Sequence, residues 1–394
     1  MWPNVAYETC AWERDYDVLA FIPKSRRRKI LPTYEAALPA KISQLTVNLS
    51  PEIQRRIADV EVAVTRFDEA QNARDWNLPA LLLRSESSSS SQIERLTSSV
   101  RNVALAELSD KAPTNALLIA GNVAAMREAL RQSGPVSIDS ICSIHDVLMA
   151  ETSEWEGLRD EQVWIGGTPY SPHGASFVPP HASRVPDYIN DLIEFGVRED
   201  VPPVAKEAIF HAQFETIHPF TDGNGRTGRA LVHRMLANDE VLMHSTLPVS
   251  AGLLHDVERY MKALDAYHVG KIEPIIACFA DALELAVVIG LRIADDVDDV
   301  LSAWRASNTD RARSASHGLP ELLVEQPVVN AAYVANRLAI TDRAARTLIE
   351  TACERGILSK MGNAKRGAYY QADELIGILE EASRLQGIRR IAAR

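Results

Sequence analysis

The sequence predicts a mainly α-helical protein with a short β-hairpin in its middle and a smaller domain at its C-terminal end. Amphipathic helical periodicity runs through most of the chain. Residues 163–181 interrupt it with β-forming residues around Gly, Pro and Ser, which is typical of a hairpin or an irregular flap. The chain has 394 residues, which is too long for one compact core and suits about two or three domains.

The first predicted helices are amphipathic and have recognisable ends. A helix is predicted over residues 50–71, with Ser50 as N-cap and Pro51 in the first turn. Further helices are predicted at 115–134 and 137–151. The apolar run at 283–294 is too short to span a bilayer, so we expect a buried helix there.

The C-terminal pattern predicts a winged helix-turn-helix module after a linker at residues 307–321. Two short helices with a tight turn at Ile340–Thr341 precede a strand, a basic turn and a second strand. The recognition helix would span about 342–355. Basic side chains that could meet DNA phosphates are Arg343, Arg346, Lys360, Lys365 and Arg366. Acidic and basic residues nearly balance in this module, so its positive charge is modest. Regulation through DNA binding by this module is therefore an alternative function.

Composition and charge limit the partners and the compartment. Hydrophobic residues make up 46% of the chain and the net charge is −11, which argues against general attraction to nucleic acid or anionic membranes. The basic stretch 24–29 is a candidate polyanion site, although a solvated arm is the simpler interpretation. The N-terminus lacks a secretory signal, and the four cysteines match neither metal-site nor disulfide spacing. We therefore expect a cytoplasmic protein without membrane association.

The segment HPFTDGNGRTGR, residues 218–229, places a Gly-rich polar turn between two amphipathic helices. Such a turn exposes several N–H groups next to the positive end of the following helix. Gly223 and Gly225 permit close approach and positive φ, as an anion-binding nest requires. Arg226 and Arg229 lie on adjacent positions of the first helical turn and suit a phosphate chain better than a single carboxylate.

Two further residues of this turn supply chemistry for transfer of a phosphate-containing group. Asp222 offers the hard oxygen ligand that a Mg²⁺ ion bridging phosphates would need. His218 lies at the entrance of the turn and has a suitable pKa to take a proton from a hydroxyl. A metallohydrolase site built on His211 and His218 is poorly supported, because no third ligand has suitable spacing.

The same segment matches the HPFx[DE]GNGRxxR signature of Fic-domain proteins at every defined position, and the chain resembles that family over about 85–285. VWIGG and FVPP resemble the family's flap, and LPVS at 247–250 its following loop. Most Fic proteins transfer AMP from ATP to a Ser, Thr or Tyr hydroxyl of a protein and release pyrophosphate. The resemblance implies a Fic-type helical bundle, ATP as substrate, Mg²⁺ as cofactor and an unidentified target protein. Self-AMPylation and homodimers are also expected from it.

The resemblance implies a role for each residue of the signature. His218 would be the general base, Asp222 would bind Mg²⁺, and Arg229 would grip the γ-phosphate. The other phosphate contacts would come from Gly223, Asn224, Gly225 and Arg226. The flap would hold the target's extended backbone through Gly167, Thr168 and Phe177. Tyr260 is a candidate nucleobase contact, although core packing is the simpler role for an aromatic residue at helical spacing.

The stretch SSSSQIERL, residues 88–96, resembles the inhibitory motif [ST]xxxE[GN], with Ser90 and Glu94 at the defined positions. The resemblance implies an inhibitory helix near 85–98, in which Glu94 pairs bidentately with Arg229 so that ATP binds unproductively. Arg95 stands where the family has Gly or Asn, and a bulky cation there would clash or alter how the helix seats. Alternative reactions are removal of AMP and use of another nucleotide donor.

These patterns divide the chain into four parts. We expect an N-terminal helical region at 1–110 that includes the inhibitory helix, and a Fic catalytic domain at 111–300. A linker at 301–320 and a winged helix-turn-helix domain at 321–394 would follow.

Overall fold

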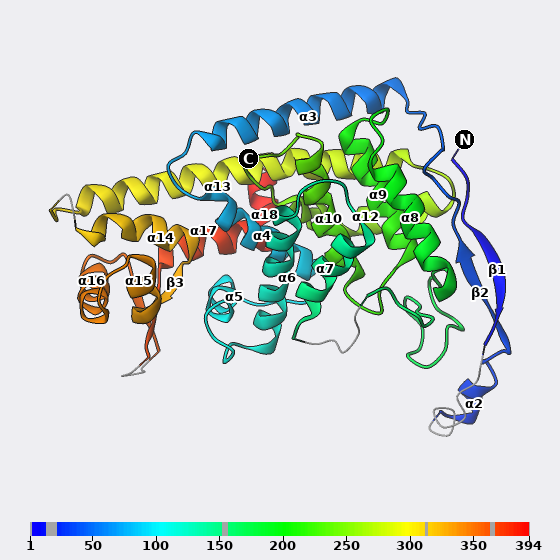
Figure 1. Cartoon of the computed structure of the whole chain (residues 1–394), viewed down its shortest axis with the longest axis horizontal. Coiled ribbons are helices and arrows are strands. Elements are labelled where there is room, and N and C mark those ends of the chain that lie inside the picture. The colour runs from blue at the N-terminus through cyan, green and yellow to red at the C-terminus, as the bar shows by residue number, and fades with distance from the viewer. Residues whose placement is uncertain (1, 13–21, 152–156, 312–313, 363–366, 394) are drawn as a thin grey trace.

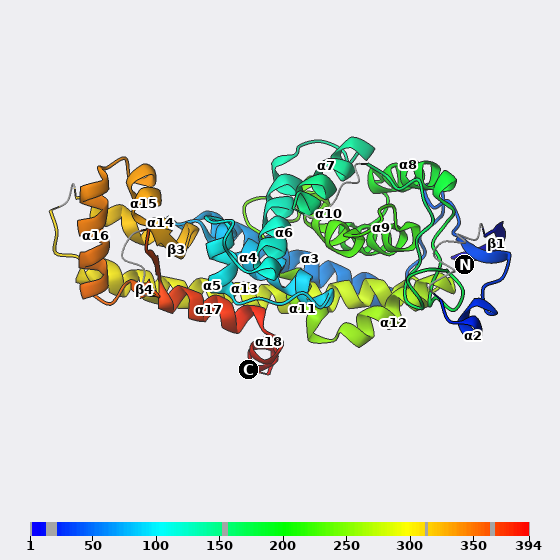
Figure 2. The ribbon, with the colours of Figure 1, turned by 90° about the horizontal axis from the view of Figure 1, so that it is seen from below.

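The computed structural model describes residues 2–12, 22–151, 157–311, 314–362 and 367–393. Two long helices, α3 (Pro51–Asn72) and α13 (Glu273–Ser307), run side by side along the molecule, and the shorter helices pack against them (Figures 1 and 2). A small β-hairpin lies at one end of the molecule, and α15, α16 and the small three-stranded sheet lie at the other, whereas the C-terminus lies near the middle. The mainly helical fold predicted from the sequence is confirmed.

The N-terminal hairpin was not predicted. Strands β1 (Ala6–Ala11) and β2 (Thr33–Leu38) pair antiparallel, and the backbone N–H of Ala37 in β2 donates to the carbonyl of Val178 in the flap at 2.9 Å. The hairpin therefore lies beside the flap. Between the strands, α2 (Lys24–Arg27) begins the basic stretch, whose Lys24, Arg28 and Lys29 are exposed, as a solvated arm requires.

The next helices confirm the predicted cap at Ser50 and show that Ser137, one of two possible caps with Asp139, starts the helix after it. The side chain of Ser50 accepts a hydrogen bond from the N–H of Ile53 and caps α3. Ser137 forms a capping box with Ser140 at the start of α7. The helices of this part after α3 are α4 (Leu78–Ile93), α5 (Val100–Ala106), α6 (Thr114–Arg131) and α7 (Ile138–Met149).

The flap has little regular structure in its described residues. Two isolated β-bridges, Ile165 to Phe177 and Thr168 to Ser171, take the place of a regular hairpin. The helices that follow it are η1 (Ala182–Arg184), α8 (Val185–Gly196), α9 (Pro203–Ile217), α10 (Asn224–Asn238), α11 (Val249–His255) and α12 (Val257–His268).

Helix α13 contains the apolar run at 283–294. By length and composition α13 could cross a membrane, but 61% of the residues in its most apolar window are buried inside the protein. Leu283, Ala286, Ile289 and Ile293 are among the buried residues. The helix is therefore a core element, as predicted, although it is far longer than the apolar run.

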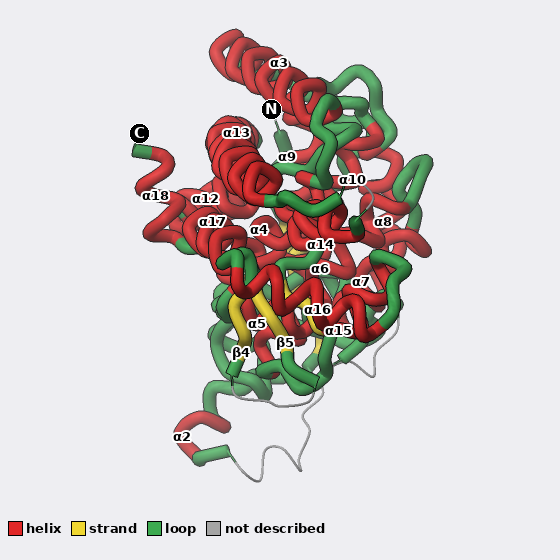
Figure 3. Tube along the Cα trace, turned by 90° about the vertical axis from the view of Figure 1, so that its left-hand side faces the viewer, coloured by secondary structure: helices red, strands yellow, loops and turns green. Residues whose placement is uncertain are grey.

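The C-terminal elements follow the predicted order of helix, turn, helix and β-hairpin. Figure 3 shows the strands beside α15 and α16, and the strand order is β3-β5-β4. Helix α13 continues to Ser307, so the predicted linker is shorter and already contains a helical turn. The elements are η2 (Ala315–Gly318), α14 (Leu319–Glu325), β3 (Val328–Asn330), α15 (Ala331–Arg337), α16 (Asp342–Glu354), β4 (Ser359–Met361), β5 (Tyr369–Gln371), α17 (Asp373–Ser383) and α18 (Leu385–Ala392).

The residues proposed to contact DNA are only partly placed. Arg343, Arg346 and Lys360 are exposed, and Lys365 and Arg366 lie outside the described residues. DNA binding stays a prediction. Helices α17 and α18 return from this part to pack on α13, and α17 also packs on α4.

Candidate active site

The central loop, residues 218–223, joins the end of α9 to the start of α10. His218 closes α9 in the left-handed conformation, at φ 53°, and Gly223 opens α10 at φ 78°. Asn224 holds the loop closed, because its side chain accepts from the N–H of Phe220 and donates to the carbonyl of Phe220, both at 2.9 Å. The interruption between the helices is therefore a fixed turn that ends at a helix N-terminus.

His218 lies at the entrance of this loop with a partly buried ring. Its Nδ1 lies 3.3 Å from the backbone carbonyl of Glu215, which can only accept, so Nδ1 bears the proton and Nε2 keeps a free lone pair. Burial lowers the pKa of His218 to about 4, although the bond to Glu215 opposes the shift. At neutral pH the imidazole is therefore a neutral base.

Two buried arginines lie at the first turn of α10. Arg226 and Arg229 are 5% and 3% exposed. The Nε of Arg226 is buried without a hydrogen-bond partner among the described residues. Such unsatisfied buried donors are rare in folded proteins, and one at a helix N-terminus fits a site built to receive an anion.

Asp222 is the candidate metal ligand. Its carboxylate is 74% exposed at the loop, where Oδ1 accepts from the N–H of Gly223 at 2.7 Å and Oδ2 lies 3.8 Å from Nη2 of Arg226. The described residues contain no cluster of three His, Cys, Asp or Glu side chains that could hold a metal by themselves. A single exposed carboxylate fits Mg²⁺, which keeps several waters and is usually held by one or two carboxylates plus phosphate oxygens.

Glu94 contacts Arg229, as predicted, and Ser90 contacts the same arginine, which was not predicted. The Nε of Arg229 donates to Oγ of Ser90 at 2.9 Å, and Nη2 donates to the carbonyl of Ser90 at 3.0 Å and to Oε1 of Glu94 at 2.8 Å. The expected bidentate pair is therefore wrong, since Glu94 uses one oxygen and Ser90 occupies the neighbouring donors. A Cβ on Gly225 would collide with Glu94, so glycine is required for this approach.

The Glu94 carboxyl is ionised in this contact. Partial burial by itself raises the pKa of Glu94, but the facing Arg229 and Arg226 guanidinium groups outweigh it, and the pKa falls below its ordinary value. The side chain keeps 41% of its surface exposed, whereas the side chain of Arg229 is 3% exposed. The buried cation is thus fixed, and its carboxylate partner lies at the surface of the site.

Helix α4, which precedes Glu94, is a core element. All residues of its polar run from Ser85 to Ser91 are buried. Glu86 is fully buried and accepts from the N–H and Oγ of Ser250 at 2.7 and 2.5 Å, and its Oε1 lies 3.0 Å from Nε2 of His233. These contacts attach α4 to both α10 and α11.

The end of α4 explains the family preference at position 95. The helix ends at Ile93, earlier than expected, with Glu94 as its C-cap and Arg95 at φ 62°. The N–H of Leu96 donates to the carbonyl of Ser91 and that of Arg95 to Gln92, both at 2.9 Å, which is a Schellman motif. Glycine or asparagine adopts this left-handed position at low cost. The expected clash is absent, because the Arg95 side chain is exposed. An arginine at this position instead costs free energy because its backbone is held in the left-handed conformation.

Replacing Arg95 with glycine is therefore expected to stabilise the protein by about 1 kcal/mol, the scale of the strain of a left-handed non-glycine residue. The free energy of unfolding, measured with urea, checks this. The matched control is Arg55→Gly, because Arg55 is an exposed arginine inside α3. Glycine there is expected to cost about 1 kcal/mol. The same sign of change in both variants would contradict the role of backbone conformation.

The predicted flap residues Gly167, Thr168 and Phe177 make their contacts outside the central loop. Gly167 has φ 75°, and a Cβ there would come within 2.9 Å of the backbone of the opposite flap segment. The carbonyl of Thr168 accepts from Nε1 of Trp164 at 2.7 Å, and Phe177 stacks on His268 with 4.5 Å between the ring centroids.

Tyr260 is 1% exposed, and its hydroxyl lies 2.7 Å from Nε2 of His211. Tyr260 therefore packs in the core behind the site, as the simpler interpretation has it.

His145 belongs to the site but was not predicted. Its ring stacks on Phe220 at 3.7 Å, and its Nε2 donates to the carbonyl of Asp222 at 3.1 Å. It therefore supports the central loop from α7. Its position between Ile144 and Leu148 on the apolar face of α7 was the available signal, since a polar residue buried there needs a partner.

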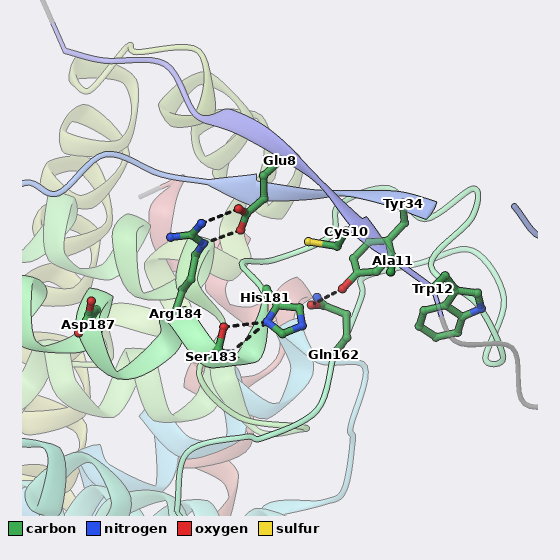
Figure 4. Close-up of a pocket in the computed structure, with 10 residues that line it drawn as sticks. All are labelled: Glu8, Cys10, Ala11, Trp12, Tyr34, Gln162, His181, Ser183, Arg184 and Asp187. Carbon is green, nitrogen blue, oxygen red and sulfur yellow. Dashed lines mark hydrogen bonds and ion pairs between the residues drawn. The ribbon is translucent and has the colours of Figure 1, made fainter. Parts of the chain in front are cut away.

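A cavity of about 780 Å³ lies beside the flap, between the N-terminal hairpin and the start of α8 (Figure 4). Its polar walls include the ion pair of Glu8 with Arg184 and the hydrogen bond from the hydroxyl of Tyr34 to Gln162. None of its lining residues belongs to the central loop or to α10. It is therefore separate from the candidate active site.

The chain is similar to known proteins in its central region. The Fic/DOC family model matches residues 135–236, which include α7, the flap and the central loop. The chain is similar to protein adenylyltransferase fic-1 of Caenorhabditis elegans, at 27% identity over 160 residues, which are 40% of this chain and 29% of that protein. It is also similar to the probable protein adenylyltransferase aq_aa38 of Aquifex aeolicus (strain VF5), at 43% identity over 70 residues, which are 18% and 22% of the two chains.

Among solved structures, a crystal structure of a Fic family protein from Desulfovibrio desulfuricans G20 aligns with a TM-score of 0.54 and 21% identity. The alignment covers 84% of this chain and 98% of that one, which shows a shared fold. The chain spans less than a third of the length of the two curated relatives, at 29% and 22%.

Proposed function

Because residues 135–236 form a Fic/DOC family domain, we propose that the protein is an adenylyltransferase that transfers AMP from ATP to a Ser, Thr or Tyr hydroxyl of a target protein. The observation that supports it best is the joint placement of a neutral base and an anion site on one loop. His218 offers a free Nε2, and Arg226 presents an unsatisfied buried donor at the N-terminus of α10. The names of the curated relatives agree with this activity.

The proposed reaction is an in-line displacement at the α-phosphorus. The target hydroxyl oxygen forms a bond to the α-phosphorus, the bond from that phosphorus to the bridging oxygen of the β-phosphate breaks, and pyrophosphate leaves. The hydroxyl proton passes to Nε2 of His218. The loop amides with Arg226 and Arg229 hold the phosphates, so positioning and charge neutralisation supply most of the rate. Mg²⁺ held by Asp222 would neutralise phosphate charge.

Regulation is part of the proposal. Arg229 is needed for the γ-phosphate, and in this structure its donors are directed to Ser90 and Glu94. ATP would then bind with its γ-phosphate misplaced, and the α-phosphate would not be aligned with the hydroxyl. The target would add its extended backbone to the flap near Gly167, Thr168 and Phe177.

The test is label transfer from ATP in the presence of Mg²⁺, with the protein itself and a cell extract as acceptors. Label from α-labelled ATP is expected on protein, and label from γ-labelled ATP is expected in pyrophosphate. Transfer of γ-label to protein would instead indicate a kinase. A panel of other nucleotides and of CDP-choline checks the alternative donors, and release of AMP from prelabelled protein by water checks the alternative of AMP removal.

A further inference from the structure

Arg159 is a buried cation that contacts both the central loop and the flap. It is 5% exposed. Its Nε donates to the carbonyl of His218 at 2.8 Å, and its Nη2 donates to Pro180 at 2.6 Å and to Ile217 at 3.4 Å. Its Nη1 donates to the carbonyl of Glu161 at 2.9 Å. One guanidinium thus joins the end of α9 to the chain at both ends of the flap, at Glu161 and Pro180.

The backbone of Arg159 reinforces this link. Its N–H donates to the carbonyl of Pro219 at 2.9 Å, directly after His218. Three consecutive carbonyls, from Ile217 to Pro219, are therefore bonded to one residue. The middle one belongs to His218, whose left-handed backbone would otherwise be unfavourable.

The acceptors of Arg159 are neutral carbonyls, which is unusual for a buried cation. Burial lowers the pKa of Arg159 to about 10, so it remains charged at neutral pH. A planar fork with five N–H donors can reach several carbonyls at once, whereas the single ammonium of lysine cannot reproduce that geometry. Retaining a buried charge for carbonyls alone indicates that their relative placement matters.

We propose that Arg159 is a positioning residue, which fixes the backbone of His218 and the flap relative to each other so that the base faces the hydroxyl of a target bound on the flap. The inference rests on the proposed function, because the base and the flap act together only in transfer to a protein hydroxyl. Within the part of the chain that the structure describes, the Arg159 side chain donates to backbone carbonyls and makes no hydrogen bond to α10 or to Glu94.

Arg159 also acts on the charge state of His218. Burial is the main cause of the low pKa of His218, and the positive charge of Arg159 lowers it further. The carbonyl of Glu215 and the carboxylates of Glu94 and Asp222 act in the opposite direction. Removing the charge of Arg159 is therefore expected to raise the pKa of His218, and keeping a charge there is expected to leave it nearly unchanged.

The experiment uses the full chain with Glu94→Gly, in which transfer is expected to be measurable, and adds Arg159→Gln or Arg159→Lys. For Arg159→Lys, kcat for AMP transfer is expected to fall about 100-fold, the scale of a small misplacement of a reacting group, with KM for ATP within about twofold of the parent. The matched control is Arg184→Gln, an exposed arginine paired with Glu8 beside the flap (Figure 4). It is expected to leave kcat unchanged.

A second measurement does not depend on activity. Titration of the labelled His218 ring by NMR, assigned with His218→Ala, is expected to show a higher midpoint in Arg159→Gln than in the parent and in Arg184→Gln. A folded Arg159→Gln protein whose His218 titrates as in the parent would overturn the proposal. If Arg159→Gln does not fold, parental kcat in Arg159→Lys would overturn it. A parent without any AMP transfer would refute the proposed function alone, and the titration would still decide the role of Arg159.

Discussion

Replacing Glu94 with glycine is expected to raise AMP transfer about 10- to 100-fold, because a hydrogen bond to a charged group is worth about 1.5–3 kcal/mol and each 1.4 kcal/mol is tenfold. Arg229 would lose the carboxylate that lies 2.8 Å from its Nη2 and would become available to the γ-phosphate. The measurement is the initial rate of labelling from α-labelled ATP with Mg²⁺.

Two further variants separate the charge of Glu94 from other effects. Glu94→Gln keeps the shape and removes the charge, so an intermediate rate is expected. Glu321→Gly removes a glutamate that pairs with Arg305 away from the site and is expected to leave the rate unchanged. Equal labelling in the wild type and in Glu94→Gly would refute the inhibitory role.

Replacing His218 with alanine in the Glu94→Gly protein is expected to lower transfer by about 10²- to 10⁴-fold, the usual contribution of a general base. ATP affinity should persist, because the phosphate contacts proposed for the loop amides, Arg226 and Arg229 remain. Rate and ATP binding are to be measured separately. His244→Ala is the matched control, since His244 is exposed and outside the site. Undiminished transfer without His218 would exclude it as the base.

The pH dependence of the same reaction follows from the lowered pKa of His218. The base must be unprotonated, and burial lowers its pKa to about 4. Transfer by the Glu94→Gly protein is therefore expected to be insensitive to this group at neutral pH. It should fall only when the pH drops to about 4 or lower, because Glu94, which raises the pKa of His218, is absent from that protein. A loss of rate centred near the ordinary histidine pKa of about 6.5 would contradict the assignment.

The residues of the central loop could be predicted because their chemistry is local in sequence. Gly223, with Arg226 and Arg229 three residues apart, specifies a turn, a helix start and a cationic face within twelve residues. The positive φ expected of Gly225 is wrong, because Gly225 lies inside α10. The caps at Ser50 and Ser137 are local in the same way.

Features formed by distant segments were missed. The side chain of Arg159 donates to carbonyls up to 59 positions away, and His145 reaches Asp222 across 77. The spacing of apolar residues predicts helices and strands, but it does not predict which distant residues will contact each other. The strands β1 and β2 are separated by a long segment, so no tight turn marked the hairpin.

The polar run from Ser85 to Ser91 is buried along its whole length. All seven of its residues, Glu86 included, lie inside the protein. Serine is small, so neighbouring helices can approach closely. The Oγ atoms of Ser87 and Ser89 are buried there without a hydrogen-bond partner among the described residues. Glu86 is also tolerated there, because Ser250 supplies two donors from another helix. Those partners become visible only after folding.

The burial of α4 determines how shortened forms of this protein would behave. The helix packs on α6, α11 and α17, so a deletion that ends after residue 98 would remove part of the hydrophobic interior together with Glu94. Such a fragment would lose its structure before it gained activity. If the proposed regulation holds, deregulated forms of the protein should therefore arise from single substitutions at the exposed end of α4, and loss of the N-terminal segment should be equivalent to loss of the protein.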